Sequence, residues 1–331
     1  MWTLVVAGAV ALLSAGEARS GAAPLSPINF SADSTRPVVI LVHGRGELPG
    51  DSVAARESWA RAIRSGTATL SGDSLLRQDD VWVAWYADAL DPLAPAVCDI
   101  APRPDASRSG TGADDEGLRA FFAAIGEGLT ATLDMLDGYA RDEARALAGD
   151  FLFIGDPVRR CAAETQLARV LARATREGRP VILVAHSFGA LLSYGYLRTS
   201  PPDDSAHYTV QKYVTIGSLL GAPGVRSMLL GDTASRARLP AGVQRWTNIV
   251  NPHDALAYSV AFETSADSAS GGRAENLTTT AGTAGEDSHY IGRYLRDPVT
   301  VRSVVGAWCD AFPAAGRATR PAGCEALASG R

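Results

Sequence analysis

The amino-acid sequence predicts an α/β fold with a mostly parallel central sheet and helices on both faces. Short, unbroken apolar runs, such as residues 38–42 and 181–184, are typical of strands that are covered on both sides. Segments with helical spacing alternate with these runs through most of the chain, as in parallel, doubly wound sheets. The length of 331 residues suffices for one large domain or two smaller ones. In such a sheet, ligands bind at the carboxyl ends of the strands.

The charge balance argues against a nucleic-acid partner. The formal net charge is -5 at pH 7, so the chain lacks the basic excess that a phosphate-binding surface needs. No group of His, Asp or Glu residues has the spacing of metal ligands. We therefore expect no nucleic acid, no metal and no cofactor.

The N-terminal residues indicate export. Residues 2–13 form an apolar run that is too short to span a bilayer but suits the core of a signal peptide, and Gly16 and Ala18 offer a cleavage site. No positive charge precedes the run, so either the start codon is misassigned or the segment is not a signal. We interpret residues 1–20 as a signal peptide of a secreted or periplasmic protein without a stable membrane span.

The four cysteines agree with an oxidising compartment. They allow three pairings. We predict disulfides Cys98–Cys161 and Cys309–Cys324, because each would fasten an insertion or a tail to the domain. Four buried free thiols are the alternative.

The first part of the domain contains two strands and a helix. An extended lead-in over 21–36 precedes the strand 38–42. The strand leads directly into a glycine-containing turn, formed by His43, Gly44, Arg45 and Gly46. Residues 51–65 predict an amphipathic helix that Gly66 stops, and residues 81–86 predict a second strand.

An insertion, residues 87–155, precedes the next strand. Its first part is rich in turn residues, and residues 118–136 have the spacing of an amphipathic helix, either a lid or a layer packed on the sheet; we favour packing. Asp156 and Pro157 then begin a helix that closes near Gly178.

The second half continues the alternation. Residues 212–217 and 245–251 predict strands, 264–288 a polar loop, and Asp297 with Pro298 the start of a final helix. We place the domain at 37–312. A C-terminal tail, 313–331, follows it.

The residue with the clearest chemical potential is Ser187. It lies between the apolar run 181–184 and a helical pattern, and the small residues Ala185 and Gly189 bracket it. A serine on such a sharp strand-to-helix turn projects its hydroxyl away from the sheet, with the unpaired N–H groups of the helix behind it. The alternative is an ordinary serine N-cap.

A serine nucleophile needs a histidine base, and the chain has five histidines. His43 ends a strand, and we expect His186 to point to the opposite side of the turn from Ser187. His207 precedes a strand in a polar stretch, and His253 suits loop structure. His289 follows a long polar loop and precedes an apolar helix, so it is our candidate base.

The base needs an acid that fixes its tautomer. Asp254 lies three residues beyond the strand 245–251, at the same edge of the sheet as the serine. Asp287 is too close to His289 in sequence to meet the ring nitrogen that faces away from the serine, and Asp297 is better used as a helix cap. Asp254 is therefore the predicted acid.

Together, the serine elbow, the early HGRG turn and the order Ser, Asp, His resemble the α/β-hydrolase superfamily, and within it secreted lipases and esterases. The resemblance runs from Val38 to Trp308 and includes VTIGSLLGAP, WTNIVNPHD and SHYIGRYLRDP. It implies Ser187 as nucleophile, His289 as base and Asp254 as acid. In this chain Ala185 replaces the first glycine of the usual GxSxG elbow, and HGRG replaces the HGGG of many esterases.

The resemblance also implies the mechanism and its other residues. The tetrahedral oxyanion would lie between the backbone N–H of Phe188 and that of Arg45, with Gly46 as second choice. Leu219, Leu220, Trp85 and Tyr86 are candidates for an acyl pocket, and ordinary core packing is the alternative for each.

These observations predict a serine hydrolase that cleaves a small-molecule or lipid acyl ester through an acyl-enzyme. An amidase, peptidase or acyltransferase would use the same three residues. The third alternative is a non-catalytic binding protein with this fold.

Overall fold

The computed structural model describes residues 36–45, 48–91, 94–100, 156–199, 208–263, 273–279, 288–312 and 319–328. The chain divides into two units, Met1–Ala32 and Asp33–Arg331, and every described residue belongs to the second unit. The predicted signal peptide 1–20 and the predicted helix 118–136 lie outside the described residues. So do Gly46, His207 and Asp287.

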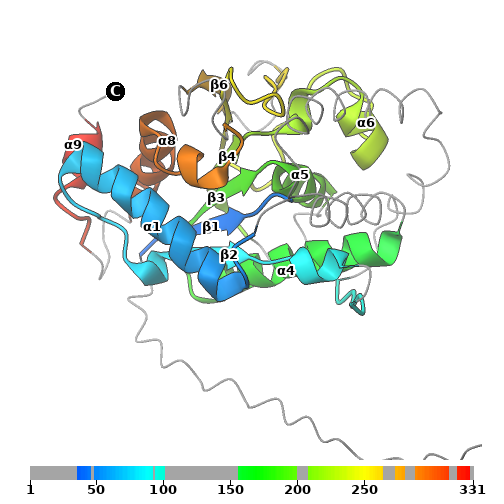
Figure 1. The fold of residues 1–331 in the computed structure, drawn as a ribbon, viewed down its shortest axis with the longest axis horizontal. Coiled ribbons are helices and arrows are strands. Elements are labelled where there is room, and N and C mark those ends of the chain that lie inside the picture. The colour runs from blue at the N-terminus through cyan, green and yellow to red at the C-terminus, as the bar shows by residue number, and fades with distance from the viewer. Residues whose placement is uncertain are drawn as a thin grey trace, which may run out of the picture. The chain divides into compact units, whose positions relative to one another are not determined.

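The described residues form one six-stranded, fully parallel sheet with the order β2-β1-β3-β4-β5-β6 (Figure 1). Its strands are β1 (Val38–Val42), β2 (Val81–Ala84), β3 (Val181–His186), β4 (Val210–Ile216), β5 (Arg245–Val250) and β6 (Arg273–Thr278). The order reverses once, because β2 lies on one side of β1 and all later strands lie on the other. Such a reversal is where parallel α/β sheets bind ligands, at the carboxyl ends of the strands. The predicted α/β class is confirmed.

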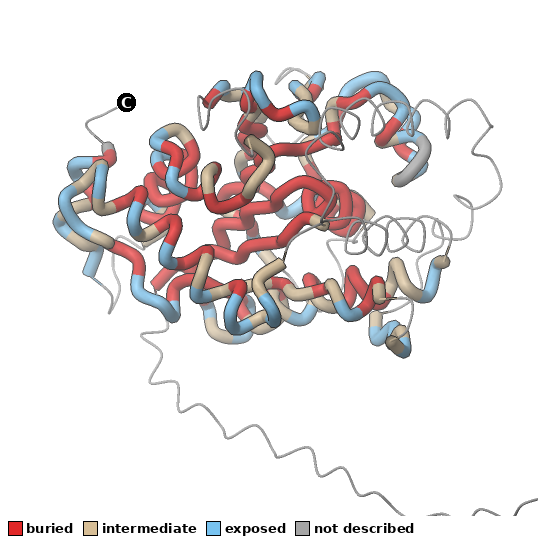
Figure 2. Tube along the Cα trace, in the orientation of Figure 1, coloured by how far each residue is buried: buried red, intermediate tan, exposed pale blue. Residues whose placement is uncertain are grey.

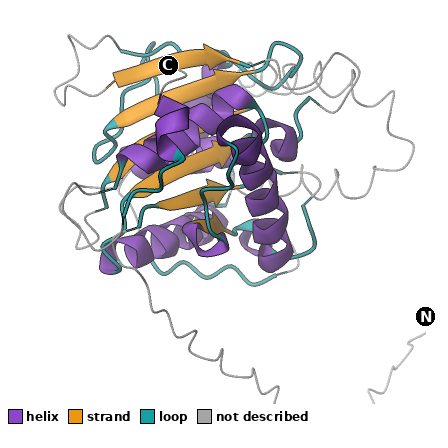
Figure 3. Ribbon diagram, turned by 90° about the vertical axis from the view of Figure 1, so that its left-hand side faces the viewer, coloured by secondary structure: helices purple, strands orange, loops and turns teal. Residues whose placement is uncertain are grey.

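Helices cover both faces of the sheet, as predicted (Figures 1 and 3). They are α1 (Ser52–Ser71), α4 (Pro157–Arg176), α5 (Phe188–Thr199), α6 (Val225–Leu230), α7 (Ile291–Tyr294), α8 (Pro298–Asp310) and α9 (Cys324–Ala328). Short 3-10 turns lie at Gln78–Asp80, Ala87–Leu90 and Leu219–Gly221. Because side chains alternate along a strand, Val39 and Leu41 pack under α1 and α8, whereas Ile40 packs under α4 and α5. The central strands β1 and β3 are therefore buried on both sides (Figure 2).

Aspartate caps begin the three long helices that flank the sheet. The carboxylates of Asp51, Asp156 and Asp297 each accept two backbone N–H groups of the following helix. The starts of these helices agree with the sequence predictions. The predicted stop at Gly66 is wrong, since α1 continues to Ser71. A Cβ atom at Gly66 would lie 2.8 Å from a methyl group of Val301, so this glycine lets α8 pack closely against α1.

The sequence also missed a strand. The predicted loop 264–288 contains β6, which pairs with β5 at the edge of the sheet. Its sequence, RAENLT, has no apolar run, and its side chains are exposed or half-buried. Asn276 connects it to β5 by accepting a hydrogen bond from the Asn248 amide at 2.9 Å. Polar pairing of this kind gives no hydrophobic periodicity, so the pattern predicted a loop.

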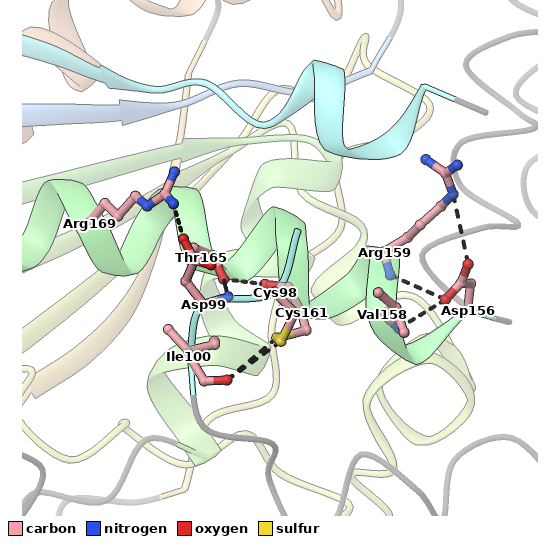
Figure 4. Close-up of a disulfide and its surroundings, with 9 residues drawn as sticks. All are labelled: Cys98, Asp99, Ile100, Asp156, Val158, Arg159, Cys161, Thr165 and Arg169. Atoms are coloured by element: carbon pink, nitrogen blue, oxygen red, sulfur yellow. Dashed lines mark hydrogen bonds and ion pairs between the residues drawn. A yellow bond between two sulfur atoms is a disulfide. The ribbon is translucent and has the colours of Figure 1, made fainter. Parts of the chain in front are cut away.

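Both predicted disulfides are present. Cys98–Cys161 joins the segment before residue 100 to α4, and Cys309–Cys324 joins α8 to α9. Around the first disulfide, Arg169 pairs with Asp99, whose backbone N–H donates to the hydroxyl of Thr165 at 3.3 Å (Figure 4). Two disulfides fit an oxidising compartment. Among the described residues, every helix is either too short or too polar to cross a lipid bilayer.

Candidate active site

Ser187 lies on a sharp turn between β3 and α5, as predicted. Its φ angle is 54°, and it is the one non-glycine residue with a positive φ in the described part of the chain. Its N–H donates to the carbonyl of Ile216, the last residue of β4, at 3.0 Å. A serine rarely adopts this backbone conformation, so the neighbouring strands must hold it in place. The turn presents the Ser187 side chain at the carboxyl ends of the strands.

The imidazole of His289 bridges Ser187 and Asp254. Its Nδ1 lies 2.9 Å and 3.0 Å from the two carboxylate oxygens of Asp254, and its Nε2 lies 2.9 Å from Oγ of Ser187. An ionised carboxylate can only accept, so Nδ1 carries the proton and donates it. With the proton of the tautomer on Nδ1, Nε2 accepts the hydrogen bond of the serine hydroxyl. The structure thus brings together the three residues predicted as nucleophile, base and acid.

Asp254 occupies a buried, well-bonded position beyond the end of β5. It is 4 % exposed, and besides His289 it accepts the hydroxyl of Tyr294 at 2.6 Å and the N–H of Leu256 at 2.9 Å. Burial alone raises the pKa of Asp254, but the hydrogen bonds from His289 and Tyr294 outweigh burial and lower it below its ordinary value. The carboxylate is therefore charged at neutral pH.

The two loops that carry the acid and the base are joined directly. The hydroxyl of Ser288 donates to the carbonyl of His253 at 2.6 Å, and the amide of Asn251 donates to the carbonyl of Ser288 at 3.3 Å. The side chain of Asn251 also accepts the N–H of His253 at 3.0 Å. These bonds fix the residue before each of Asp254 and His289, so their side chains have little freedom to separate.

The turn after β1 lies against the serine. A Cβ atom at Gly44 would lie 2.8 Å from Cβ of Ser187, which leaves no room for a side chain there. His43 fixes this turn: its Nδ1–H donates to the carbonyl of Gly44 at 2.7 Å, and its Nε2 accepts the N–H of Tyr86 at 3.1 Å. Burial lowers the pKa of His43 to about 3, so the ring stays neutral. His43 is thus a structural residue beside the site.

Of the predicted oxyanion donors, Phe188 follows Ser187 in the sequence, and Arg45 follows Gly44, which lies against Ser187. Phe188 is the first residue of α5, so its backbone N–H lies at the positive end of the helix dipole. The Gly44 carbonyl is directed toward the ring of His43, and a trans peptide directs its N–H opposite to its C=O. The N–H of Arg45 therefore points away from His43. The second choice, Gly46, lies outside the described residues.

The predicted pocket residues have mainly core contacts. Leu219, Leu220 and Tyr86 are buried in the cluster under α4 and α5. Tyr86 stacks on the ring of His43 at 4.0 Å between ring centroids, and its hydroxyl donates to the His43 carbonyl. Trp85 is half-buried, with its ring 4.9 Å from that of His43. These contacts fit the core-packing alternative.

The structure corrects the expected direction of His186. Instead of pointing away from Ser187, its side chain lies beside His289, with ring centroids 4.7 Å apart, and its Nε2 is 2.8 Å from the carbonyl oxygen of His289. Tyr294, which contacts the acid, was not among the predicted site residues. An aromatic residue within an apolar helical segment resembles ordinary core, and only its place five residues after His289 could have drawn attention to it.

The arrangement is suited to nucleophilic chemistry by Ser187. Within the described residues, no group of three or more His, Cys, Asp or Glu side chains could hold a metal ion. No protein-family model matches the chain, and no curated protein matches it. The geometry around Ser187, His289 and Asp254 is therefore the main indication of what the protein does.

Proposed function

We propose that this protein is a serine hydrolase that cleaves carboxylic esters through an acyl-enzyme. The observation that carries the proposal is the continuous chain of hydrogen bonds from Ser187 through His289 to Asp254. A serine hydroxyl is a poor nucleophile unless a base takes its proton, and a buried carboxylate holds that base in the correct tautomer.

We further propose membership of the α/β-hydrolase superfamily, in its lipase and esterase branch. Three features support it: the parallel sheet, the serine on a strained turn between a strand and a helix, and the chain order Ser, Asp, His. Each of the three residues follows a different part of the sheet, since Ser187 follows β3, Asp254 follows β5 and His289 follows β6. This placement explains how residues far apart in sequence meet at one edge.

In the first half of the reaction, Oγ of Ser187 attacks the ester carbonyl while Nε2 of His289 takes the hydroxyl proton. The imidazolium that forms is stabilised by the Asp254 carboxylate. The tetrahedral oxyanion receives hydrogen bonds from the N–H of Phe188 at the start of α5 and from that of Arg45. One donor of this kind contributes about 3 to 4 kcal/mol to stabilising the transition state.

In the second half, the proton returns and water replaces the alcohol. His289 gives its proton to the leaving alkoxide, which departs as the alcohol and leaves an ester of Ser187. The neutral imidazole then takes a proton from water, the hydroxide attacks the acyl carbon, and the carboxylic acid leaves as Ser187 regains its proton. Both halves use the same three side chains.

We propose a secreted or periplasmic location as well. The two disulfides support it, because such bonds are rare where glutathione and thioredoxin keep thiols reduced.

The test begins with a fluorophosphonate probe, which reacts with activated serines. Wild-type protein should be labelled, and Ser187→Ala should not. A panel of p-nitrophenyl esters of increasing acyl length then measures turnover, and matched p-nitroanilides measure amide cleavage. Faster turnover of anilides than of esters would redirect the proposal to an amidase. Failure of wild type to react with the probe or any ester would support a binding protein.

A further inference from the structure

Two hydrogen bonds next to the proposed catalytic residues join the same chain segments that carry those residues. His186 bonds to the backbone of His289, and Tyr294 bonds to the carboxylate of Asp254. Neither side chain bonds to Oγ of Ser187, and neither is needed to write the reaction. Both side chains nevertheless hold the segments that carry the three reacting groups.

The first bond joins the nucleophile strand to the base. His186 is the last residue of β3, and its Nε2 lies 2.8 Å from the carbonyl oxygen of His289. A carbonyl oxygen only accepts, so Nε2 of His186 carries the proton. Because His186 is the residue before Ser187, this bond fixes the backbone of the base relative to the nucleophile. It duplicates the 2.9 Å contact between Nε2 of His289 and Oγ of Ser187.

The second bond joins the helix after the base to the acid. Tyr294 ends α7, the short helix that begins two residues after His289. Its buried hydroxyl donates to Oδ2 of Asp254 at 2.6 Å. The bond duplicates the link between Nδ1 of His289 and that carboxylate. It also occupies a lone pair of Oδ2 and thereby favours one orientation of the carboxylate.

We propose that His186 and Tyr294 are positioning residues, which hold His289 over Ser187 and Asp254 against His289 through hydrogen bonds that last through the whole reaction cycle. The proposal rests on the proposed ester hydrolysis. The triad's own bonds change as protons move, whereas the bond from His186 to a backbone carbonyl and that from the Tyr294 hydroxyl require no proton transfer. The two bonds therefore keep the geometry while the triad bonds are remade.

The electrostatics of His186 fit this role. Burial lowers its pKa to about 3, so the ring stays neutral when the neighbouring His289 becomes positively charged. A charged ring at a centroid distance of 4.7 Å would oppose that charge. Burial beside Asp254 likewise raises the pKa of Tyr294, so its hydroxyl keeps the proton that it donates.

Tyr294→Phe tests the second bond, and the chain offers a matched control. Tyr194 is also fully buried, and its hydroxyl also donates to a buried carboxylate, that of Asp232, at 3.1 Å. We expect Tyr294→Phe to lower kcat for a p-nitrophenyl ester by about 10- to 100-fold with KM unchanged, since a small misplacement of reacting groups has effects of that size. Tyr194→Phe should leave kcat within about twofold. Equal kcat values for the two variants would overturn the role of Tyr294.

His186→Leu and His186→Gln test the first bond. Leucine cannot donate, whereas the amide nitrogen of glutamine reaches about as far as Nε2 of histidine and can donate to the His289 carbonyl. We expect kcat to fall about 10- to 100-fold in His186→Leu and to recover by at least threefold in His186→Gln, with KM unchanged in both. If glutamine and leucine reduce kcat equally, or raise KM instead, His186 has no positioning role. The glutamine variant also keeps the test valid if leucine prevents folding.

A measurement without substrate separates this inference from the proposed activity. The Nδ1–H proton that His289 shares with Asp254 should give a downfield NMR resonance protected from exchange with water. Exchange should be at least tenfold faster in Tyr294→Phe and His186→Leu than in wild type and Tyr194→Phe. Equal exchange in all four proteins overturns the inference. If exchange differs as expected but wild type does not react with the fluorophosphonate, the ester hydrolysis fails and the positioning contacts stand.

Discussion

A buried aspartate lies at each end of the parallel strands, and the two aspartates have different partners. We call these ends the carboxyl edge and the amino edge. At the carboxyl edge, Asp254 accepts hydrogen bonds from His289, Tyr294 and the backbone. At the amino edge, Asp80 lies just before β2 and pairs with Arg36 and Arg179, which precede β1 and β3. The exposures are similar, 4 % for Asp254 and 2 % for Asp80. Both carboxylates join segments that are distant in sequence.

The partners decide what each edge can do. Arg36 binds Asp80 through two nitrogens, at 3.2 Å and 2.6 Å, and Arg179 adds a third contact at 3.0 Å. A guanidinium group is a poor proton acceptor and donor near neutral pH, so these ion pairs are suited to a structural role. The imidazole beside Asp254 has Nε2 available to accept a proton, and this atom faces Ser187. The amino edge joins three strands through ion pairs, whereas the proposed reaction would use the carboxyl edge to take up a proton.

The largest expected effect comes from removing the reacting groups of the carboxyl edge. Ser187→Ala or His289→Ala should lower kcat by about four to six orders of magnitude, with Asp254→Asn somewhat less severe. The free energy of unfolding, measured by urea denaturation, should remain close to that of wild type for Ser187→Ala. Near wild-type ester turnover in Asp254→Asn would show that another residue acts as the acid.

Asp80→Asn should produce the opposite result. It leaves two buried guanidinium groups without their carboxylate, and breaking a buried pair of this kind costs about 3 to 5 kcal/mol. Urea denaturation measures this loss. The kcat of the folded fraction should stay within about twofold of wild type, because this cluster lies at the opposite edge of the sheet from the triad. A large fall in kcat with little change in stability would show that the two edges are coupled.

Acid should lower the free energy of unfolding through the buried histidine His186 at the carboxyl edge. Burial lowers the pKa of His186 from 6.5 to about 3, so between these values the unfolded chain binds a proton that the folded chain does not. The free energy of unfolding therefore falls as pH falls, by up to about 1.4 kcal/mol per pH unit for this residue. Asp254 contributes little above about pH 4.5, because its carboxylate binds protons in the unfolded chain only as the pH approaches 3.8 and its pKa in the folded protein is lower still.

Urea denaturation at several pH values from 7 to 4.5 measures this slope. His186→Gln has no titrating group at that position. In this variant, the change of the free energy of unfolding with pH should therefore be smaller by the contribution of His186. His43 is similarly buried, with a pKa of about 3, so part of the slope should remain in this variant. An unchanged slope in His186→Gln would mean that His186 binds the same number of protons in the folded and the unfolded protein over this range.

The contrast between the edges also explains what the sequence could predict. The strands β1 and β3 and the turn at Ser187 follow from unbroken apolar runs and small residues, so the pattern reveals them directly. The edge strand β6 could not be found, because its pairing with β5 uses polar side chains and leaves no apolar period. Likewise, the Asp80 cluster combines residues that look like ordinary surface charges until the strand order brings them together.

At the carboxyl edge, the sequence predicted which residues meet but not what supports them. Ser187 and Asp254 follow predicted strands, which end at one edge, and the loop before His289 could carry its imidazole over that edge, so their approach could be inferred. The direction of His186 was wrong, because it depends on the side of the sheet from which the His289 loop returns. Tyr294 lies in a four-residue helix whose orientation only the tertiary structure shows.

The smallest expected effect on kcat comes from Gly217, whose backbone lies against Asp254 and His289. Gly217 follows β4 with a φ of 56°, and a Cβ atom there would lie 3.0 Å from Oδ2 of Asp254 and 3.3 Å from Cε1 of His289. Gly72, at the end of α1, has a φ of 75° and open space around the same position. Alanine at either site costs about 1 to 2 kcal/mol, because a side chain disfavours this backbone conformation.

Comparison of the two alanine variants therefore isolates crowding from backbone strain. Both should lose similar stability in urea denaturation. Gly217→Ala alone should also lower kcat, by about 10-fold, because the new methyl group displaces Asp254 or His289 by a few tenths of an ångström. If Gly217→Ala has the same kcat as Gly72→Ala, Asp254 and His289 tolerate a small displacement. The close packing at the carboxyl edge would then contribute to stability only, like the ion pairs at the amino edge.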